Sequence, residues 1–155
     1  MFKRHENLSK WVKGINENQS GLFPNDFTAF YYAFLVGIKH KKREEDINNA
    51  VDILRDVAPS HNESKLHIYG LLITTYTEEM GMEIREKKDI KNIIKDLIKI
   101  NERDGSWTLS EEGFKRVNQY AYAGFEIIYK HNKYATDPVQ TIKSIIELIN
   151  SKDSK

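Results

Sequence analysis

The stretch that decides the fold reads FTAFYYAFLVGI and occupies residues 27–38. Its apolar side chains would lie on nearly every side of a helix, which is typical of a helix buried at the centre of a helical protein. Asp26 precedes the stretch as a candidate N-cap. The basic residues 39–43 follow it, where cations stabilise the negative end of a helix dipole. We therefore predict a central helix over residues 27–41.

The sequence argues against a membrane protein and against thiol chemistry. A bilayer core requires roughly 20 consecutive apolar residues, and residues 27–38 are the longest apolar run. Residues 1–10 carry basic side chains with no apolar run after them, unlike a secretory signal. There is no cysteine, which excludes disulfides, thiolate metal sites and a cysteine nucleophile. We expect a cytoplasmic protein with no membrane contact.

The overall charge argues against a broad nucleic-acid-binding surface. Lys and Arg number 24 and Asp and Glu number 23, so the net charge is +1. A protein that binds nucleic acid over a wide surface usually has a larger basic excess. A local basic face is still open, because net charge does not describe how the charges are distributed.

Apolar residues spaced three and four apart predict further helices in the first half of the chain. Residues 4–16 carry such a stripe. Residues 44–57 begin with three acidic residues, which favour a helix start, and a proline follows them. Ser60 with Glu63 forms a capping-box pattern that would start a helix continuing through residues 66–76.

Three more helices are predicted in the second half. Residues 90–98 carry a clear isoleucine and leucine stripe, and Asp104–Gly105 would end that helix. A serine at the start of residues 110–128 is a candidate cap for the next helix. Residues 137–149 begin with an Asp N-cap, an N1 proline and a capping-box glutamine, so a last helix is predicted there.

Seven helices with short connections predict an all-α fold over residues 1–150, either a compact single-domain bundle or an irregular array of about seven helices. The tail at residues 151–155 is expected to fray. Three glycines lie inside predicted helices, where each costs about 1 kcal/mol relative to alanine. They are Gly37, Gly70 and Gly124. Close approach of two helices at these positions would compensate for that cost.

Two basic clusters are candidate contact surfaces for nucleic acid or a protein partner. The first comprises Lys39, Lys41, Lys42 and Arg43. The second is expected as a ridge on one helix, opposite its isoleucine face, and comprises Lys88, Lys91, Lys95, Lys99 and Arg103. Either cluster could bind phosphates. Either could instead be a solvated helix face or helix end, because acidic residues stand beside both.

The sequence contains no recognisable pattern for catalysis. Its five histidines lack the helical i, i+4 pair of an HExxH zinc site, and no phosphate-binding loop, dinucleotide-binding loop or nucleophile elbow occurs. We therefore expect no catalytic residue, no metal and no cofactor. A set of aromatic residues near the chain's C-terminal part could stack on bases, although the edge of a helical core explains them better. The set is Tyr120, Tyr122, Phe125, Tyr129 and Tyr134.

Two segments together resemble a known group of proteins. The first has GLFP at residues 21–24, an apolar helix with a Leu–Gly step and a basic end at Arg43–Glu44. The second is YAYAGFEII at residues 120–128, where Tyr122 and Ala123 stand in place of the group's usual Asn and Gly. These features resemble the small helical proteins associated with Dnd-type DNA phosphorothioation systems. The resemblance covers about a third of the chain and implies an accessory protein of prokaryotic DNA modification or anti-phage defence.

We therefore hypothesise a non-enzymatic defence-system component that binds other proteins of that system, and could bind DNA, through its basic surfaces. An alternative is a helical interaction adaptor or a homodimeric structural module unrelated to DNA. A third hypothesis is a metal-dependent hydrolase or nuclease with a site assembled from distant acidic residues, which would require converging carboxylates with raised pKa values.

Overall fold

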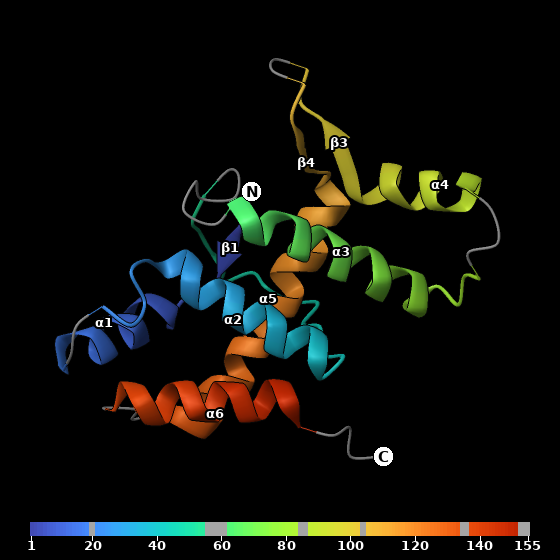
Figure 1. Cartoon of the computed structure of the whole chain (residues 1–155). Helices are drawn as coiled ribbons and strands as arrows, with labels where there is room; N and C mark the ends of the chain where they lie inside the picture. The colour runs from blue at the N-terminus through green and yellow to red at the C-terminus, as the bar shows by residue number, and fades with distance from the viewer. Residues whose placement is uncertain (19–20, 55–61, 84–86, 103–104, 134–136, 152–155) are drawn as a thin grey trace. The chain divides into compact units, whose positions relative to one another are not determined.

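The computed structural model describes residues 1–18, 21–54, 62–83, 87–102, 105–133 and 137–151, and these are mostly helical. Their helices are α1 (Leu8–Asn18), α2 (Asp26–Lys39), α3 (Asn62–Glu79), α4 (Lys87–Leu97), α5 (Glu111–Asn132) and α6 (Pro138–Asn150) (Figure 1). Their strands are β1 (Lys3–Arg4), β2 (Val51–Asp52), β3 (Ile98–Ile100) and β4 (Trp107–Leu109). The predicted helical class is confirmed.

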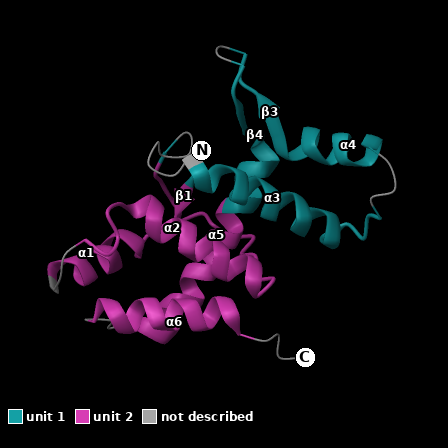
Figure 2. Cartoon of the chain, in the orientation of Figure 1, with its two compact units in different colours: residues 1–2, 54–117 teal, residues 3–53, 118–155 magenta. Residues whose placement is uncertain are grey.

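Contacts divide the chain into two compact units (Figure 2). Unit 1 comprises residues 1–2 and 54–117, with α3, α4, the β3–β4 hairpin and the first turns of α5. Unit 2 comprises residues 3–53 and 118–155, with α1, α2, α6, the rest of α5 and the antiparallel β1–β2 pair. Among the described residues, no helix is both long and apolar enough to cross a bilayer.

Unit 2 has its core around α2, as the apolar stretch predicted. The face formed by Ala29, Ala33 and Val36 packs into a cluster of buried residues from α1, α5 and α6. The stripe predicted for the first helix is fully enclosed in this cluster, and it comprises Leu8, Trp11, Val12 and Ile15. On α6 the buried residues include Ile145 and Leu148, whereas Val139 and Ile146 of the same helix are exposed.

The helix caps were predicted correctly at two of three described positions. Asp137 caps α6 by accepting hydrogen bonds from the amides of residues 139 and 140, and Ser110 accepts from the Gly113 amide at the start of α5. For α2 the prediction was wrong, because Asn25 is the N-cap and accepts from the Thr28 amide at 2.9 Å. Asp26 instead pairs with Arg4 at 3.0 Å and accepts from the Ser9 hydroxyl, which ties α2 to β1 and α1.

Two glycines allow α2 and α5 to cross in close contact within unit 2 (Figure 1). A methyl group on Gly37 would overlap the Tyr120 carbonyl, and one on Gly124 would overlap the Ala33 carbonyl. The predicted reason for these glycines is therefore confirmed. The prediction fails at Gly70, where an added methyl would meet no atom within 4 Å.

The helix predicted over residues 44–57 is absent from residues 44–54, and residues 55–57 and the predicted Ser60 cap lie outside the described residues. Acidic side chains bind nearby backbone amides: Glu44 accepts from the Asp46 amide, and Asp46 accepts from the Asn48 amide, each at 3.2 Å. Such local bonds compete with helix formation. The segment then pairs as β2 with β1.

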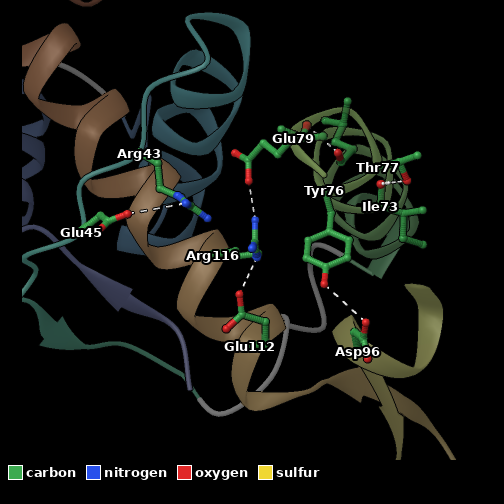
Figure 3. A network of polar contacts seen from close by, with 11 residues as sticks. Arg43, Glu45, Ile73, Tyr76, Thr77, Glu79, Asp96, Glu112 and Arg116 are labelled. Carbon is green, nitrogen blue, oxygen red and sulfur yellow. Dashed lines mark hydrogen bonds and ion pairs between the residues drawn. The ribbon is translucent and has the colours of Figure 1, made fainter. Parts of the chain in front are cut away.

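Unit 1 is held together by a network around Arg116 of α5 (Figure 3). The guanidinium binds Glu79 at the end of α3 and Glu112 one turn earlier on α5. It also lies over the ring of Tyr76, 4.4 Å from the centroid, and the Tyr76 hydroxyl donates to Asp96 of α4 at 3.4 Å. The Arg116 side chain is only 11% exposed, whereas the Glu79 and Glu112 side chains are 31% and 41% exposed, so water screens these ion pairs in part.

The helix predicted to continue from residue 90 to Asp104 ends earlier, at Leu97. Ile98–Ile100 forms β3, which pairs antiparallel with β4 in the register Ile98↔Leu109 and Ile100↔Trp107. Isoleucine favours strands because it is branched at Cβ. Gly105 adopts a φ of +70°, a left-handed conformation that glycine allows, and its amide donates to the Asn101 carbonyl within the turn. Asp104 lies outside the described residues.

Candidate interaction surface

An apolar groove with lysines along it lies between α4 and the β3–β4 hairpin in unit 1. Its volume is about 370 Å³. It is lined by Lys87, Ile90, Lys91, Ile94, Lys95, Ile98, Lys99, Ile100 and Trp107. The groove therefore joins a lysine-bearing helix to the apolar face of a two-stranded ribbon.

The sequence of α4 places isoleucines on two of its sides. Ile93 and Leu97 are buried in unit 1. Ile90 and Ile94 lie on the groove side, and Ile90 is 38% exposed. Lys87, Lys91 and Lys95 follow each other at intervals of four residues, so they form one stripe along the groove.

The hairpin supplies the most exposed apolar residues of the groove. Ile100 and Trp107 stand directly opposite each other across the two strands and are 64% and 54% exposed. The strand that carries Trp107 is anchored to α3, because the Tyr69 hydroxyl donates to the Trp107 carbonyl at 3.2 Å. Large apolar side chains held in solvent on a fixed backbone are typical of an interaction site.

The charge along this surface is positive. Residues 87–100 contain five lysines and two aspartates, a net charge of +3 (5 − 2). One of those aspartates, Asp96, already accepts the hydroxyl of Tyr76. A negatively charged ligand would therefore be attracted to the groove, with a strength that depends on salt.

The second predicted cluster is only partly reproduced. Lys91, Lys95 and Lys99 line the groove, but Lys88 is exposed on α4 without lining it, and Arg103 lies outside the described residues. The predicted single-helix ridge is wrong, because Lys99 lies on β3. Ile100 and Trp107 were not predicted as site residues, although the alternation Ile-Lys-Ile and Trp-Thr-Leu on either side of a turn could have indicated a hairpin.

The first predicted cluster lies in unit 2. Lys41, Lys42 and Arg43 line a pocket together with residues of α5, whereas Lys39, the last residue of α2, does not line it. This pocket contains a mixture of positive and negative side chains.

The aromatic residues of α5 belong to the core, which confirms the preferred explanation for them. Tyr120, Tyr122 and Phe125 are buried, Tyr129 is half-buried, and Tyr134 lies outside the described residues. Buried rings have no free face for a base, so stacking on nucleic acid would require unpacking unit 2.

Two buried ionisable side chains of unit 2, His5 and Tyr122, lie beside the exposed carboxylate of Glu6. The ring of His5 lies 4.3 Å from the ring of Tyr122, and the Tyr122 hydroxyl donates to Glu6 at 2.9 Å. Burial lowers the pKa of His5 below its ordinary 6.5, although Glu6 and Glu126 act in the opposite direction. The Nδ1 atom of His5 accepts from the Asn7 amide, which suits a neutral ring.

In the part of the chain that the structure describes, no group of three or more histidine or acidic side chains lies close enough together to hold a metal ion. Comparison of the chain with models of protein families, with curated proteins and with solved structures gave no match.

Proposed function

We propose that this protein is a non-enzymatic binding component that docks an acidic amphipathic segment of a partner protein in the groove between α4 and the β3–β4 hairpin. The observation that carries the proposal is the pairing of two well-exposed apolar residues, Ile100 and Trp107, with a stripe of lysines. The resemblance to Dnd-associated proteins supports a partner from a DNA-modification or anti-phage defence system.

The apolar groove favours a protein partner over DNA. Specific contacts to DNA are largely hydrogen bonds to phosphates and base edges, whereas isoleucines and a tryptophan offer few donors. An amphipathic helix can instead lay its apolar residues into such a groove. Its acidic residues would then face Lys87, Lys91 and Lys95.

The expected energetics agree with this mode of binding. Full burial of a large aliphatic side chain contributes about 1.5–3 kcal/mol, so Ile100 and Trp107 could act as anchors. Tryptophan is also among the residues that most often dominate binding energy at protein interfaces. The lysines would chiefly raise the association rate and select partners of the opposite charge.

The proposal can be tested in two stages. The tagged full chain is used to capture companions from its native host, and each captured protein is purified. An acidic amphipathic segment of that protein is then synthesised as a peptide, and its affinity for the full chain is measured by calorimetry. We expect binding that weakens as salt increases, because the lysines contribute long-range attraction.

Matched variants show whether the groove is responsible. Ile100→Ser removes a groove residue and should weaken peptide binding by about tenfold or more, as expected for an interface anchor. Leu66→Ser is the control, because Leu66 is 76% exposed on α3 and does not line the groove. Equal peptide binding by both variants would refute docking in the groove.

A parallel titration with DNA distinguishes a protein partner from a DNA partner. A short DNA duplex is titrated against the same proteins at low salt. Duplex binding that is lost in a Lys91→Gln/Lys95→Gln variant, together with no measurable peptide binding, would replace the protein-docking proposal with direct DNA contact through α4. Weak duplex binding with strong peptide binding would support the proposal.

A further inference from the structure

The pocket that contains part of the first basic cluster lies in unit 2, where the segment after α2 runs along α5. Its volume is about 330 Å³, within the range of small-molecule sites. Its ionisable side chains are Lys41, Lys42, Arg43 and Glu44 from the segment, and Glu126 and Lys130 from α5. Charged groups that are distant in the sequence thus converge on one small space.

The backbone of this segment is fixed before any ligand arrives. Lys41 has a φ of 49°, a left-handed conformation that reverses the chain at the end of α2. The Lys42 amide then donates to the Gly37 carbonyl at 3.0 Å, and the Glu44 amide donates to the Gln119 carbonyl of α5 at 3.2 Å. Binding would therefore require little ordering of the backbone, which reduces its entropic cost.

The charges in the pocket match a phosphate group attached to a polar body. Four cationic side chains and two carboxylates give a net charge of +2 (4 − 2). Arginine and lysine are the usual ligands of phosphate, and arginine can bind two phosphate oxygens at once. The same Arg43 also pairs with Glu45 at 3.7 Å, but Glu45 is exposed at its side chain (82%), so this pair is weak.

The two carboxylates would be unfavourable beside a bare phosphate, which suggests that the ligand also carries hydrogen-bond donors. Glu44 and Glu126 can accept hydrogen bonds from hydroxyl or amino groups. We propose that this pocket binds a nucleoside phosphate, with the phosphates against Lys41, Lys42, Arg43 and Lys130 and the sugar or base donors against the two glutamates. This inference does not depend on the groove of unit 1.

The test uses ATP as the probe and tripolyphosphate as a phosphate source without a nucleoside. Calorimetry of the full chain at low salt should give an ATP Kd of about 1 mM or tighter, and the affinity should fall as salt increases. A Lys42→Gln/Lys130→Gln variant should bind ATP at least about tenfold more weakly, since it loses two of the four cations. Lys143→Gln on α6 is the control, because Lys143 is exposed and does not line the pocket.

Circular dichroism would first establish that each variant is folded. No ATP binding at about 1 mM, or equal binding by the double variant and the control, would overturn the proposal. A Glu126→Gln variant keeps the four cationic side chains that would bind phosphate. It should reduce the ratio of the affinity for ATP to the affinity for tripolyphosphate. If the parent chain binds tripolyphosphate as tightly as ATP, the pocket recognises phosphate alone and the nucleoside part of the proposal is wrong.

Discussion

The α2–α5 crossing of unit 2 and the β3–β4 hairpin of unit 1 treat their apolar residues in opposite ways. Unit 2 encloses the apolar helix α2 on several sides and brings its backbone against α5 at Gly37 and Gly124. Unit 1 also has buried residues, but it leaves Ile100 and Trp107 more than half exposed on a hairpin. Dense packing in one unit indicates a role in stability, whereas exposed apolar side chains in the other indicate a role in binding.

The largest effect is expected from Gly124→Ala in unit 2. The added methyl would overlap the Ala33 carbonyl and approach the Gly37 amide, so α2 and α5 would have to separate. We expect a loss of about 3 kcal/mol in the free energy of unfolding, at the upper end for overpacked cores. Urea unfolding followed by the fluorescence of buried Trp11, in a Trp107→Phe background, measures it.

Gly14→Ala is the matched control for this prediction. Gly14 lies inside α1 of the same unit, and an added methyl would meet no atom within 4 Å. Alanine should therefore leave stability unchanged or raise it by up to about 1 kcal/mol through its helix propensity. Similar losses at both positions would show that the close crossing is not what requires glycine.

A somewhat smaller effect is expected from Arg116→Ala in unit 1. Glu79 and Glu112 would lose their partner, and Tyr76 would lose the cation above its ring. We expect a loss of about 2 kcal/mol, below the range for a fully buried ion pair because the glutamates are partly exposed. Urea unfolding measures the loss, and hydrogen exchange should show it in α3. Lys115→Ala, exposed on the same helix, should change stability by less than about 0.5 kcal/mol.

The third prediction concerns the pH dependence of unit 2. His5 is buried and its pKa is lowered, so the folded state resists protonation more than the unfolded state does. The stability that comes from keeping His5 neutral is fully present above pH 6.5, the ordinary pKa of histidine. This stability should be lost as the pH falls from 6.5 through the lower pKa that His5 has in the folded protein. Urea unfolding at several pH values should show this decline, and His5→Gln should make the curve flatter in that range. If stability falls with pH as steeply in the His5→Gln variant as in the parent protein, His5 is not the group responsible for the decline.

The smallest effect on stability is expected in the groove itself. Ile100→Ser should cost less than about 1 kcal/mol, because Ile100 is largely exposed in the unbound protein. Ile93→Ser on the buried side of α4 should cost about 3 kcal/mol or more. If the two variants lose similar stability, Ile100 is structural, and the contrast between the units disappears.

The parts of the fold that could be predicted from the sequence are those that local rules decide. The apolar run of α2 could only be accommodated inside a core, and the Asp137–Pro138 pair starts α6 where the capping rules place it. The glycines at residues 37 and 124 were correctly predicted as contact points, because a glycine inside a helix is unfavourable without such a reason.

The rest depended on choices between local and tertiary interactions. Helical spacing continues from Ile94 to Ile98, yet the chain leaves the helix because Ile98–Ile100 pairs with residues 107–109. The side chains of Glu44 and Asp46 accept hydrogen bonds from backbone amides two residues on, a local arrangement that competes with a helix. The candidate site was found only through its lysines, since the exposure of Trp107 depends on which side of the hairpin faces solvent.

The close contact between Gly37 and Gly124 also limits how the sequence can change in evolution. A larger residue at Gly124 would press on the backbone of α2 beside Gly37, so neither position can change alone without moving both helices. In a library that randomises the two codons together, selection for folded protein should return glycine at both. The pair, with the spacing between them, would then serve as a signature for tracing distant descendants of this fold.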